Sequence, residues 1–530
     1  MSIPHHETIP RYLAHWARHT PDATAIVHAG LSVSYGELAR QVDEVARALL
    51  ADGVRKGDRV AVLAHPTRFY WLTFLATLNI GAVWLGLNPR YRLPELEYNV
   101  GNSRPTLLLG MSGHEGDDFS GTLLQLAKTQ QGQKVPVVFG AASPADIGLE
   151  PWDEFLARGK ATTDAQLQSA RDSVDPDSTA LIVYTSGSTG RPKGAVLGHR
   201  GLARSFEIQA GRAPVNPIRV IANLPINHIG GVGDLCCTPL IQGGTIVLQE
   251  RFDAHAMLEA VEKYGVNAFM QVPTTLKILA EHPDFSSHDL SGLRYVSWGG
   301  GPLPLDMVRR WRALGVHLGT TYGMTEITGS ITYSAPDASD DELAATVGRP
   351  IAEIELRVVG DDGRDVAPHE TGEIWVKHPG LLLEYFENVE ATKEAFSDDG
   401  FFKTGDVGYL RPDGNMCLVA RTKEIFKSGG YNTYPREIEL ALEELPAVRL
   451  AAVVATPHPT FGEVGIAYVE TSDSTVNEAT LVDWCRKRLT NYKVPKRIFV
   501  VDALPLLPVG KVDKMALRQR AAAEAHPHDI

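Results

Sequence analysis

The feature that most constrains this sequence is a loop at residues 184–194, YTSGSTGRPKG, which directly follows the apolar stretch 180–183. A short apolar run before such a loop is typical of a buried strand. The loop holds three glycines, several hydroxyl side chains and Lys193. Glycines let backbone N–H groups approach a ligand, and hydroxyl and ammonium groups donate to phosphate oxygens. We therefore predict a polyphosphate-binding loop, although it lacks the glycine that a Walker A loop requires before its lysine.

This loop resembles the signature loop of the acyl-adenylate-forming superfamily, which contains acyl-CoA synthetases, beetle luciferases and the adenylation domains of peptide synthetases. The resemblance extends from about residue 20 to about residue 517. It implies that the loop binds ATP through Thr185, Ser186, Gly187, Ser188, Thr189, Gly190 and Lys193.

Composition excludes several other classes. The 530 residues carry a formal net charge of −13, so general electrostatic attraction to nucleic acid or anionic membrane is not expected. The four cysteines show neither metal-ligand spacing nor a disulfide framework, which fits a reducing cytoplasm. No signal-peptide pattern opens the chain. The uncharged segment 69–89 is long enough for a bilayer, but its interleaved polar residues and Gly81 favour a buried helix followed by a strand.

Strand and helix patterns alternate through the first part of the chain, which is typical of mostly parallel sheets covered by helices. Residues 161–177 are predicted to be a linker. From residue 354 the pattern changes to short strands, with a hairpin expected at 409–419. We predict an α/β fold in which residues 1–420 form an N-terminal adenylation domain with a small β subdomain. Residues 421–424 would be a hinge, and residues 425–530 a small mobile α+β domain.

Two further motifs resemble nucleotide-binding segments of the superfamily. The sequence WGGGP at 298–302 follows a predicted strand, and ligands of open α/β sheets bind at the carboxyl ends of strands. In TTYGMTE at 320–326, the resemblance implies that Tyr322 stacks on adenine and that Glu326 binds Mg²⁺. Each pattern alone would indicate only a turn. The residues assigned to ATP here are Gly299, Gly300, Gly301, Pro302, Thr321, Tyr322, Gly323, Met324 and Thr325.

The remaining nucleotide and hinge positions lie in the last quarter of the chain. Asp406, in the sequence KTGD, is suited to accept hydrogen bonds from both ribose hydroxyls. By resemblance, Arg421 also contacts the ribose and Lys423 stands at the hinge. Lys511 matches the catalytic lysine, which would bring a mobile positive charge to the transition state.

The acid and CoA sites are less strongly marked in the sequence. His228 matches an aromatic or histidine position beside the acyl pocket, and the glycines that follow it are expected to leave space there. Trp298 stands where relatives have a small residue, and it is predicted to line the same pocket; the alternative is that it packs into the sheet behind. The positions assigned to acyl or CoA binding are His228, Gly233, Trp298, Thr328, Gly429, Gly430 and Tyr431.

The resemblance implies an AMP-forming carboxylic acid–CoA ligase. ATP, Mg²⁺ and CoA would be required without a tightly bound prosthetic group, and the catalytic residues would be Lys511, Thr185, Glu326 and His228. The acid is expected to be a fatty acid or a bulky aryl acid, and a homodimer is left open. The alternatives are an adenylation enzyme that loads a carrier protein, a luciferase-like oxygenase and a nucleotide sensor without turnover. The lack of a carrier domain favours free CoA, and the presence of Lys511 and Glu326 argues against a sensor.

Overall fold

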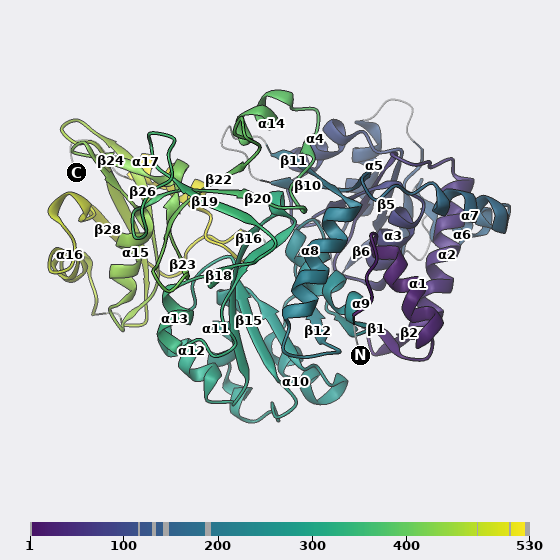
Figure 1. Cartoon of the computed structure of the whole chain (residues 1–530), viewed down its shortest axis with the longest axis horizontal. Coiled ribbons are helices and arrows are strands. Elements are labelled where there is room, and N and C mark those ends of the chain that lie inside the picture. The colour runs from purple at the N-terminus through teal and green to yellow at the C-terminus, as the bar shows by residue number, and fades with distance from the viewer. Residues whose placement is uncertain are drawn as a thin grey trace. The chain divides into compact units, whose positions relative to one another are not determined.

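The computed structural model describes residues 3–114, 117–129, 134–140, 148–185, 192–473, 475–507 and 510–524 (Figure 1). The chain divides into two compact units. The first contains Met1–Ala344, Ile351–Ile354 and Lys377–Phe396, and the second contains Ala345–Pro350, Glu355–Val376 and Ser397–Ile530. The predicted hinge at 421–424 therefore lies within the second unit, and the division into domains at that hinge stays a prediction.

One sheet of the first unit is parallel in its centre and antiparallel at both ends. Strands β16, β15, β14, β12, β13 and β1 run parallel, whereas β17 pairs antiparallel with β16 and β2 with β1. Their bounds are β17 Gly329–Tyr333, β16 His317–Met324, β15 Tyr295–Gly299, β14 Ala268–Gln271, β12 Arg219–Ala222, β13 Thr245–Leu248, β1 Thr24–His28 and β2 Leu31–Ser34.

A second sheet of this unit carries the signature loop. Its order is β21-β11-β10-β4-β3-β5-β8-β9, and the pairs from β10 to β9 are parallel. The bounds are β21 Glu384–Tyr385, β11 Lys193–Gly198, β10 Thr179–Thr185, β4 Val83–Leu87, β3 Arg59–Leu63, β5 Leu107–Met111, β8 Val137–Phe139 and β9 Glu150–Pro151, and β6 Gly113–His114 pairs with β7 Asp117–Asp118 apart from it. The mostly parallel α/β architecture predicted from the sequence is thus confirmed.

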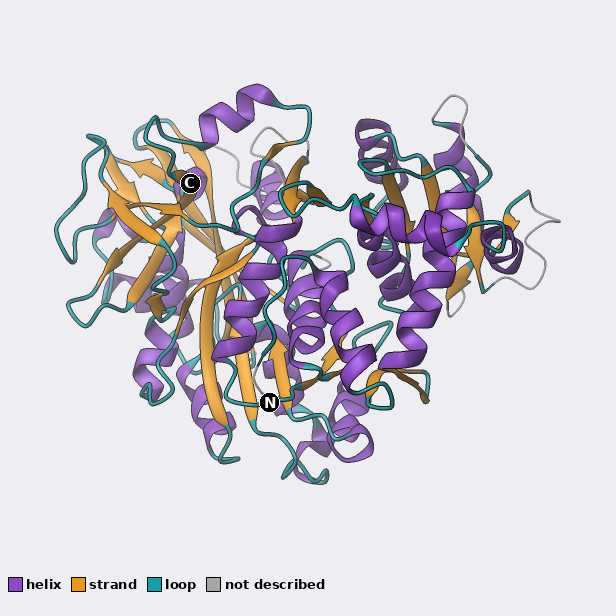
Figure 2. Cartoon of the chain, turned by 45° about the vertical axis from the view of Figure 1, so that its right-hand side comes forward, coloured by secondary structure: helices purple, strands orange, loops and turns teal. Residues whose placement is uncertain are grey.

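Helices flank the strands of the first unit (Figure 2). They are α1 Ile9–His19, α2 Tyr35–Ala51, α3 Arg68–Asn79, α4 Leu93–Ser103, α5 Ser120–Lys128, α6 Trp152–Gly159, α7 Asp164–Asp172, α8 His199–Arg212, α9 Thr238–Gln242, α10 Ala254–Tyr264, α11 Pro273–Glu281, α12 Leu305–Arg312, α13 Asp340–Ala345 and α14 Val389–Ala395. Helix α3 followed by β4 confirms the interpretation of segment 69–89. Within the described ranges, no helix is both long and apolar enough to span a bilayer.

The linker predicted at 161–177 is wrong, because most of it forms helix α7. Thr163 caps this helix: its hydroxyl accepts the Gln166 backbone N–H at 3.2 Å, and the Gln166 side chain accepts the Thr163 N–H at 2.8 Å. Such a reciprocal capping box satisfies two backbone donors at the start of a helix. The polar composition of the segment had hidden this local signal.

The second unit contains one antiparallel sheet and one mixed sheet, in which β28 pairs parallel with β27. One has the order β19-β20-β22-β23, with bounds Glu355–Val359, Gly372–Lys377, Phe402–Leu410 and Met416–Arg421. The other has the order β25-β24-β27-β26, with β28 beside β27, and bounds Tyr431–Thr433, Phe426–Ser428, Gly462–Thr471, Val448–His458 and Arg497–Val501. Helices α15 Pro435–Glu443, α16 Glu478–Arg486 and α17 Lys514–Glu524 accompany it. The β22–β23 pair confirms the hairpin predicted at 409–419, with Gly414 at φ +83° in its turn.

Candidate active site

The signature loop connects two paired strands. Thr185 ends β10, Lys193 begins β11, and these two residues face each other in the antiparallel register. The loop positions predicted to bind phosphate, Ser186, Gly187, Ser188, Thr189 and Gly190, lie outside the described residues. Both ends of the loop are nevertheless fixed by the sheet, so Thr185 and Lys193 occupy defined positions beside it.

Glu326 lies at the centre of a polar cluster next to this loop. Its carboxylate Oε1 accepts hydrogen bonds from the Thr185 hydroxyl at 3.1 Å and from the Tyr385 hydroxyl at 3.1 Å, and the residue is 7% exposed. The Lys193 ammonium lies 5.2 Å from the centre of the Tyr385 ring. Three predicted site residues that are far apart in the sequence, Thr185, Lys193 and Glu326, are therefore brought together in the first unit.

Tyr385 is a member of this cluster that the sequence did not reveal. Burial raises the pKa of its phenol, and the neighbouring Glu326 carboxylate raises the pKa further, so Tyr385 stays protonated and acts as a donor. Strand β21 places it, because Tyr385 pairs with Ala195 on β11. No motif surrounds Tyr385 in the sequence, and it reaches Glu326 through this strand pairing and through the nearby Leu382 N–H, which donates to the Glu326 carbonyl at 2.7 Å.

The two motifs assigned to adenine lie on neighbouring parallel strands. Gly299 at the end of β15 faces Thr321 on β16, and a Cβ atom on Gly299 would lie 2.9 Å from the Thr321 hydroxyl. Gly300 follows at φ +81°, a conformation that favours glycine. Gly301 and Pro302 continue from β15, whereas Tyr322, Gly323 and Met324 complete β16 and Thr325 begins the 3₁₀ turn Thr325–Ile327. The carboxyl ends of both strands therefore meet, as the sequence predicted.

Trp298 is buried in the hydrophobic core of the first unit. Alternate side chains of a strand point to opposite faces, and Trp298 shares its face of β15 with Val296. It is 1% exposed and packs in a hydrophobic cluster with Leu303 and Trp311, whereas Tyr295 packs on a different cluster. The indole thus packs in the core, which favours the alternative interpretation, and a place for Trp298 in the acyl pocket stays a prediction.

The glycines after His228 do not leave open space either. A Cβ atom would lie 2.4 Å from the Pro225 carbonyl oxygen at Gly231 and 1.8 Å from the Phe206 ring at Gly233. These glycines let the π-helix Gly230–Cys237 pack closely on its neighbours, which corrects the interpretation that they make room for a bulky acid. His228 lies at the start of this segment, where its Nδ1 accepts the Gly230 backbone N–H at 3.0 Å.

Asp234 lies on the same π-helix and carries an unusual proton affinity. Burial raises the pKa of its carboxyl to about 7, and a hydrogen bond from Gln209 offsets part of this rise. In the part of the chain that the structure describes, no group hydrogen-bonds to Asp234 Oδ1, which is buried. The pKa of this carboxyl therefore lies close to neutral pH.

This proton should make stability depend on pH. An unfolded aspartate titrates near pH ~3.9, so between about pH 4 and 7 the folded chain binds more protons at Asp234 than the unfolded chain. The free energy of unfolding should then fall as pH rises, by at most about 1.4 kcal/mol per pH unit. Asp234→Asn should remove this contribution. Urea unfolding at about pH 5 and about pH 7 would measure it, with the exposed Asp337→Asn as control; equal pH dependence in parent and Asp234→Asn would contradict the assignment.

In the second unit, the predicted ribose residues form an ion pair. Asp406 on β22 faces Arg421 on β23, and Arg421 Nε lies 2.9 Å from Asp406 Oδ1. Lys511 lies in a turn in which its carbonyl accepts the Leu507 N–H at 2.7 Å. Desolvation and the Arg421 cation lower the pKa of the Lys511 amine, whereas the Asp406 carboxylate raises it. The proposed catalytic lysine is thus within electrostatic range of the proposed ribose pair.

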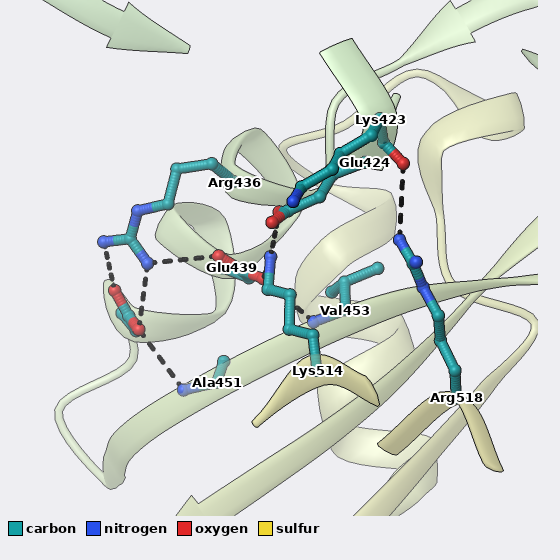
Figure 3. Close-up of polar contacts among 9 residues, drawn as sticks. Lys423, Glu424, Arg436, Glu439, Ala451, Val453, Lys514 and Arg518 are labelled. Carbon is teal, nitrogen blue, oxygen red and sulfur yellow. Dashed lines mark hydrogen bonds and ion pairs between the residues drawn. The ribbon is translucent and has the colours of Figure 1, made fainter. Parts of the chain in front are cut away.

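The proposed hinge position Lys423 borders a network of partly buried charges (Figure 3). Lys514 on α17 lies 2.7 Å from Glu424 and 2.9 Å from Glu439 on α15. Burial alone would raise the pKa of Glu439, but Lys514 and Arg436 lower it, so the carboxylate stays ionised. In Figure 3, Lys423 contributes its backbone carbonyl, which accepts a hydrogen bond from the Arg518 guanidinium at 3.4 Å. Glu424 is therefore paired with α17 and is linked to α15 through Lys514.

The positions assigned to CoA differ in their surroundings. Gly429 and Gly430, at φ +59° and +87°, form the two-residue turn between β24 and β25. Tyr431 is 62% exposed and stacks on Tyr492 at 4.8 Å. Thr328, by contrast, is buried in the first unit, and its hydroxyl donates to the Gly380 carbonyl at 2.5 Å. A structural role accounts for Thr328, whereas the Gly429–Gly430 turn presents backbone and an aromatic ring at the surface.

Comparison with known proteins places this geometry in a family. The chain matches the family described as AMP-binding enzyme over residues 13–386 and the AMP-binding enzyme C-terminal domain over residues 437–511. It is 36% identical to a feruloyl-CoA synthase from Amycolatopsis sp over 506 residues, which cover 95% of this chain and 97% of that protein. It is 33% identical to an indoleacetate–CoA ligase from Aromatoleum aromaticum, over 95% of this chain and 96% of that protein.

Solved structures agree over nearly the whole chain. The ATP-bound structure of MatB from Rhodopseudomonas palustris has a TM-score of 0.81 and 29% sequence identity, covering 97% of this chain and 99% of that chain. An o-succinylbenzoate CoA synthetase from Bacillus subtilis, solved with ATP and magnesium, has a TM-score of 0.80 and 28% identity, covering 96% and 99%. The chain therefore belongs to the family of AMP-binding enzymes, and it is an AMP-forming acid–CoA ligase that uses ATP and CoA as substrates.

Proposed function

We propose that this ligase activates a bulky carboxylic acid that carries a ring system, rather than a long-chain fatty acid. The relatives support this substrate class, since one is named for a feruloyl group and another for indoleacetate. Neither Trp298 nor the glycines after His228 contribute to the choice, because they pack inside the protein. A homodimer and a cytoplasmic location stay predictions.

The reaction follows from the ligase class. A carboxylate oxygen of the acid bonds to the α-phosphorus of ATP, the bond to the β-phosphate oxygen breaks, and pyrophosphate leaves. The CoA sulfur then bonds to the acyl carbon, the bond to AMP breaks, and the thiol proton passes to solvent. Positioning and electrostatic stabilisation are the main requirements of the first step.

The assignment of residues to this first step rests on the cluster around Glu326. Both hydroxyl donors, Thr185 and Tyr385, reach the same carboxylate oxygen, Oε1, so neither bond uses Oε2. A buried carboxylate beside a phosphate-binding loop suits Mg²⁺, which prefers one or two carboxylates together with substrate phosphates. When bound, Mg²⁺ would neutralise phosphate charge there. Lys193 adds a positive charge on the same side, and Tyr385 orients the carboxylate.

A screen of pyrophosphate release tests the substrate class. Short, medium and long-chain acids, aryl acids and polycyclic acids would be compared, each with and without CoA. We expect the highest kcat/KM for an acid with a ring system, and release of AMP and formation of the thioester only with CoA. A clear preference for long unbranched acids would refute the proposal. Thioester formation on a carrier protein but not on CoA would instead support the carrier-loading alternative.

Replacing the two proposed nucleotide carboxylates should have separable effects. Glu326→Gln keeps the shape and the hydroxyl acceptor but removes the charge, so the Mg²⁺ concentration for half-maximal rate should rise by about tenfold or more. Asp406→Ala should mainly raise the KM for ATP, because the ribose contact is lost. Pyrophosphate release measured against Mg²⁺ and against ATP would separate them. The exposed Glu390→Gln serves as a matched control, and unchanged Mg²⁺ and ATP dependence in both variants would contradict these roles.

A further inference from the structure

Three metal-ligand side chains meet on the first unit, and none of them is among the residues assigned to ATP. One ligand atom from each of His255, Asp284 and His288 lies within 4.8 Å of the other two. His255 is in the first turn of α10, Asp284 is in the 3₁₀ turn Pro283–Ser286, and His288 follows that turn. The cluster thus joins two segments about 30 residues apart, and the ligase reaction described above uses none of its members.

The distances are close to those of a metal site. His255 Nδ1 lies 3.0 Å from Asp284 Oδ2, and the ring centres of His255 and His288 are 5.1 Å apart, with an angle of 62° between the ring planes. Two ligands at about 2.1 Å from a tetrahedral ion are themselves about 3.4 Å apart. The His255–Asp284 pair therefore needs to open only slightly to enclose an ion, and the ligand atom of His288, which lies within 4.8 Å of the other two, needs to come closer.

A second observation is independent of these distances. The Nε2 atom of His288 is buried, and no described residue donates a hydrogen bond to it or accepts one from it. A buried polar atom without a partner is costly, and native structures usually satisfy it by a ligand, an ion or water. His282 supports the arrangement, because its Nδ1 accepts the backbone N–H of Asp284 at 3.2 Å and so holds the turn that presents the carboxylate.

We propose that His255, Asp284 and His288 bind Zn²⁺ or a similar divalent transition metal, with a further coordination position filled by water. Two imidazoles and one carboxylate form a mixed nitrogen and oxygen donor set that suits zinc. Mg²⁺ and Ca²⁺ prefer oxygen ligands alone, so this site would not compete for the Mg²⁺ assigned to Glu326.

The ion would connect two parts of one hydrophobic core. Met257 and Leu258 on α10 and Phe285 and Leu290 near the 3₁₀ turn belong to the same buried cluster. A metal that binds the folded chain and not the unfolded chain stabilises the fold. The site therefore stabilises the fold of the first unit, and ligase activity at saturating substrate concentrations does not depend on it.

The test uses the full-length protein after treatment with a chelator and removal of that chelator. Calorimetric titration with Zn²⁺ should show one ion bound per chain with a Kd in the micromolar range or below, and Zn²⁺ should raise the melting temperature in buffer without Mg²⁺. Co²⁺ should give a visible absorption band typical of tetrahedral coordination. Addition of the chelator should reverse all three signals.

Single substitutions then locate the ion. His255→Ala and His288→Ala should each weaken Zn²⁺ binding by about tenfold or more and abolish the rise in melting temperature. His317→Ala removes an exposed histidine of the same unit and should bind Zn²⁺ as the parent does. Because His255 is also exposed, its variant should fold even if loss of the more buried His288 disturbs the turn. No Zn²⁺ binding by the parent, or equal binding by His255→Ala and the parent, would overturn the proposal.

Discussion

Lys511→Ala should slow acyl-AMP formation by about 10²–10³-fold or more, yet leave the conversion of supplied acyl-AMP to the thioester largely intact. As the proposed catalytic lysine, Lys511 would supply positive charge where charge builds up during adenylation, and the structure places it within electrostatic range of Asp406 and Arg421. Pyrophosphate release measures the first half-reaction, and thioester formation from synthetic acyl-AMP measures the second. Lys511→Arg keeps the charge and should retain more adenylation than Lys511→Ala.

Lys423→Pro provides the complementary test. Proline fixes φ at this position, so a turn of the C-terminal part about the proposed hinge should be hindered. We expect thioester formation to fall and adenylation to persist. Lys427→Ala, an exposed lysine beyond the hinge, is the control. If Lys511→Ala and Lys423→Pro lose the same half-reaction, the two conformations proposed for the two steps do not exist.

Trp298→Ala should cost about 3–5 kcal/mol of stability without changing which acids are used. The indole is 1% exposed and packs with Leu303 and Trp311, so its removal leaves a cavity between β15 and the helices. Trp298→Phe, which leaves a smaller cavity, should lose less. Urea unfolding would be measured beside kcat/KM over a series of acids. A variant that unfolds in urea like the parent and accepts longer or bulkier acids would show that Trp298 lines the acyl pocket.

Much of the fold followed from local patterns in the sequence. The apolar run before the signature loop is strand β10, the hairpin around Asp413 and Gly414 is β22–β23, and segment 69–89 is α3 and β4. These predictions succeeded because the spacing of apolar residues, the glycines at turns and the lengths of helices can be read from consecutive residues. The neighbouring positions of Gly299 and Thr321 also followed, since parallel strands end at one edge of a sheet.

The rest depended on contacts between distant segments. Tyr385 has no motif around it, and contacts between distant segments, such as its pairing with Ala195, bring it to Glu326. The face of the sheet on which Trp298 lies is a matter of strand register, which the chain's composition does not reveal. Gly231 and Gly233 looked like open space because a glycine in a sequence gives no sign of whether a ligand or its own protein approaches it.

The charge network beside the proposed hinge would limit how the C-terminal part can turn. On one side, Arg421 is paired with Asp406; on the other, Glu424 is bound to Lys514, which also reaches Glu439. Only Thr422 and Lys423 lie between these anchored ends. Each residue contributes two soft backbone torsions, so about four angles must absorb any rotation. With so few degrees of freedom, the C-terminal part would have only a small set of accessible orientations. A change in a few backbone torsions, rather than the free motion of a flexible linker, would then separate the two steps of the ligase.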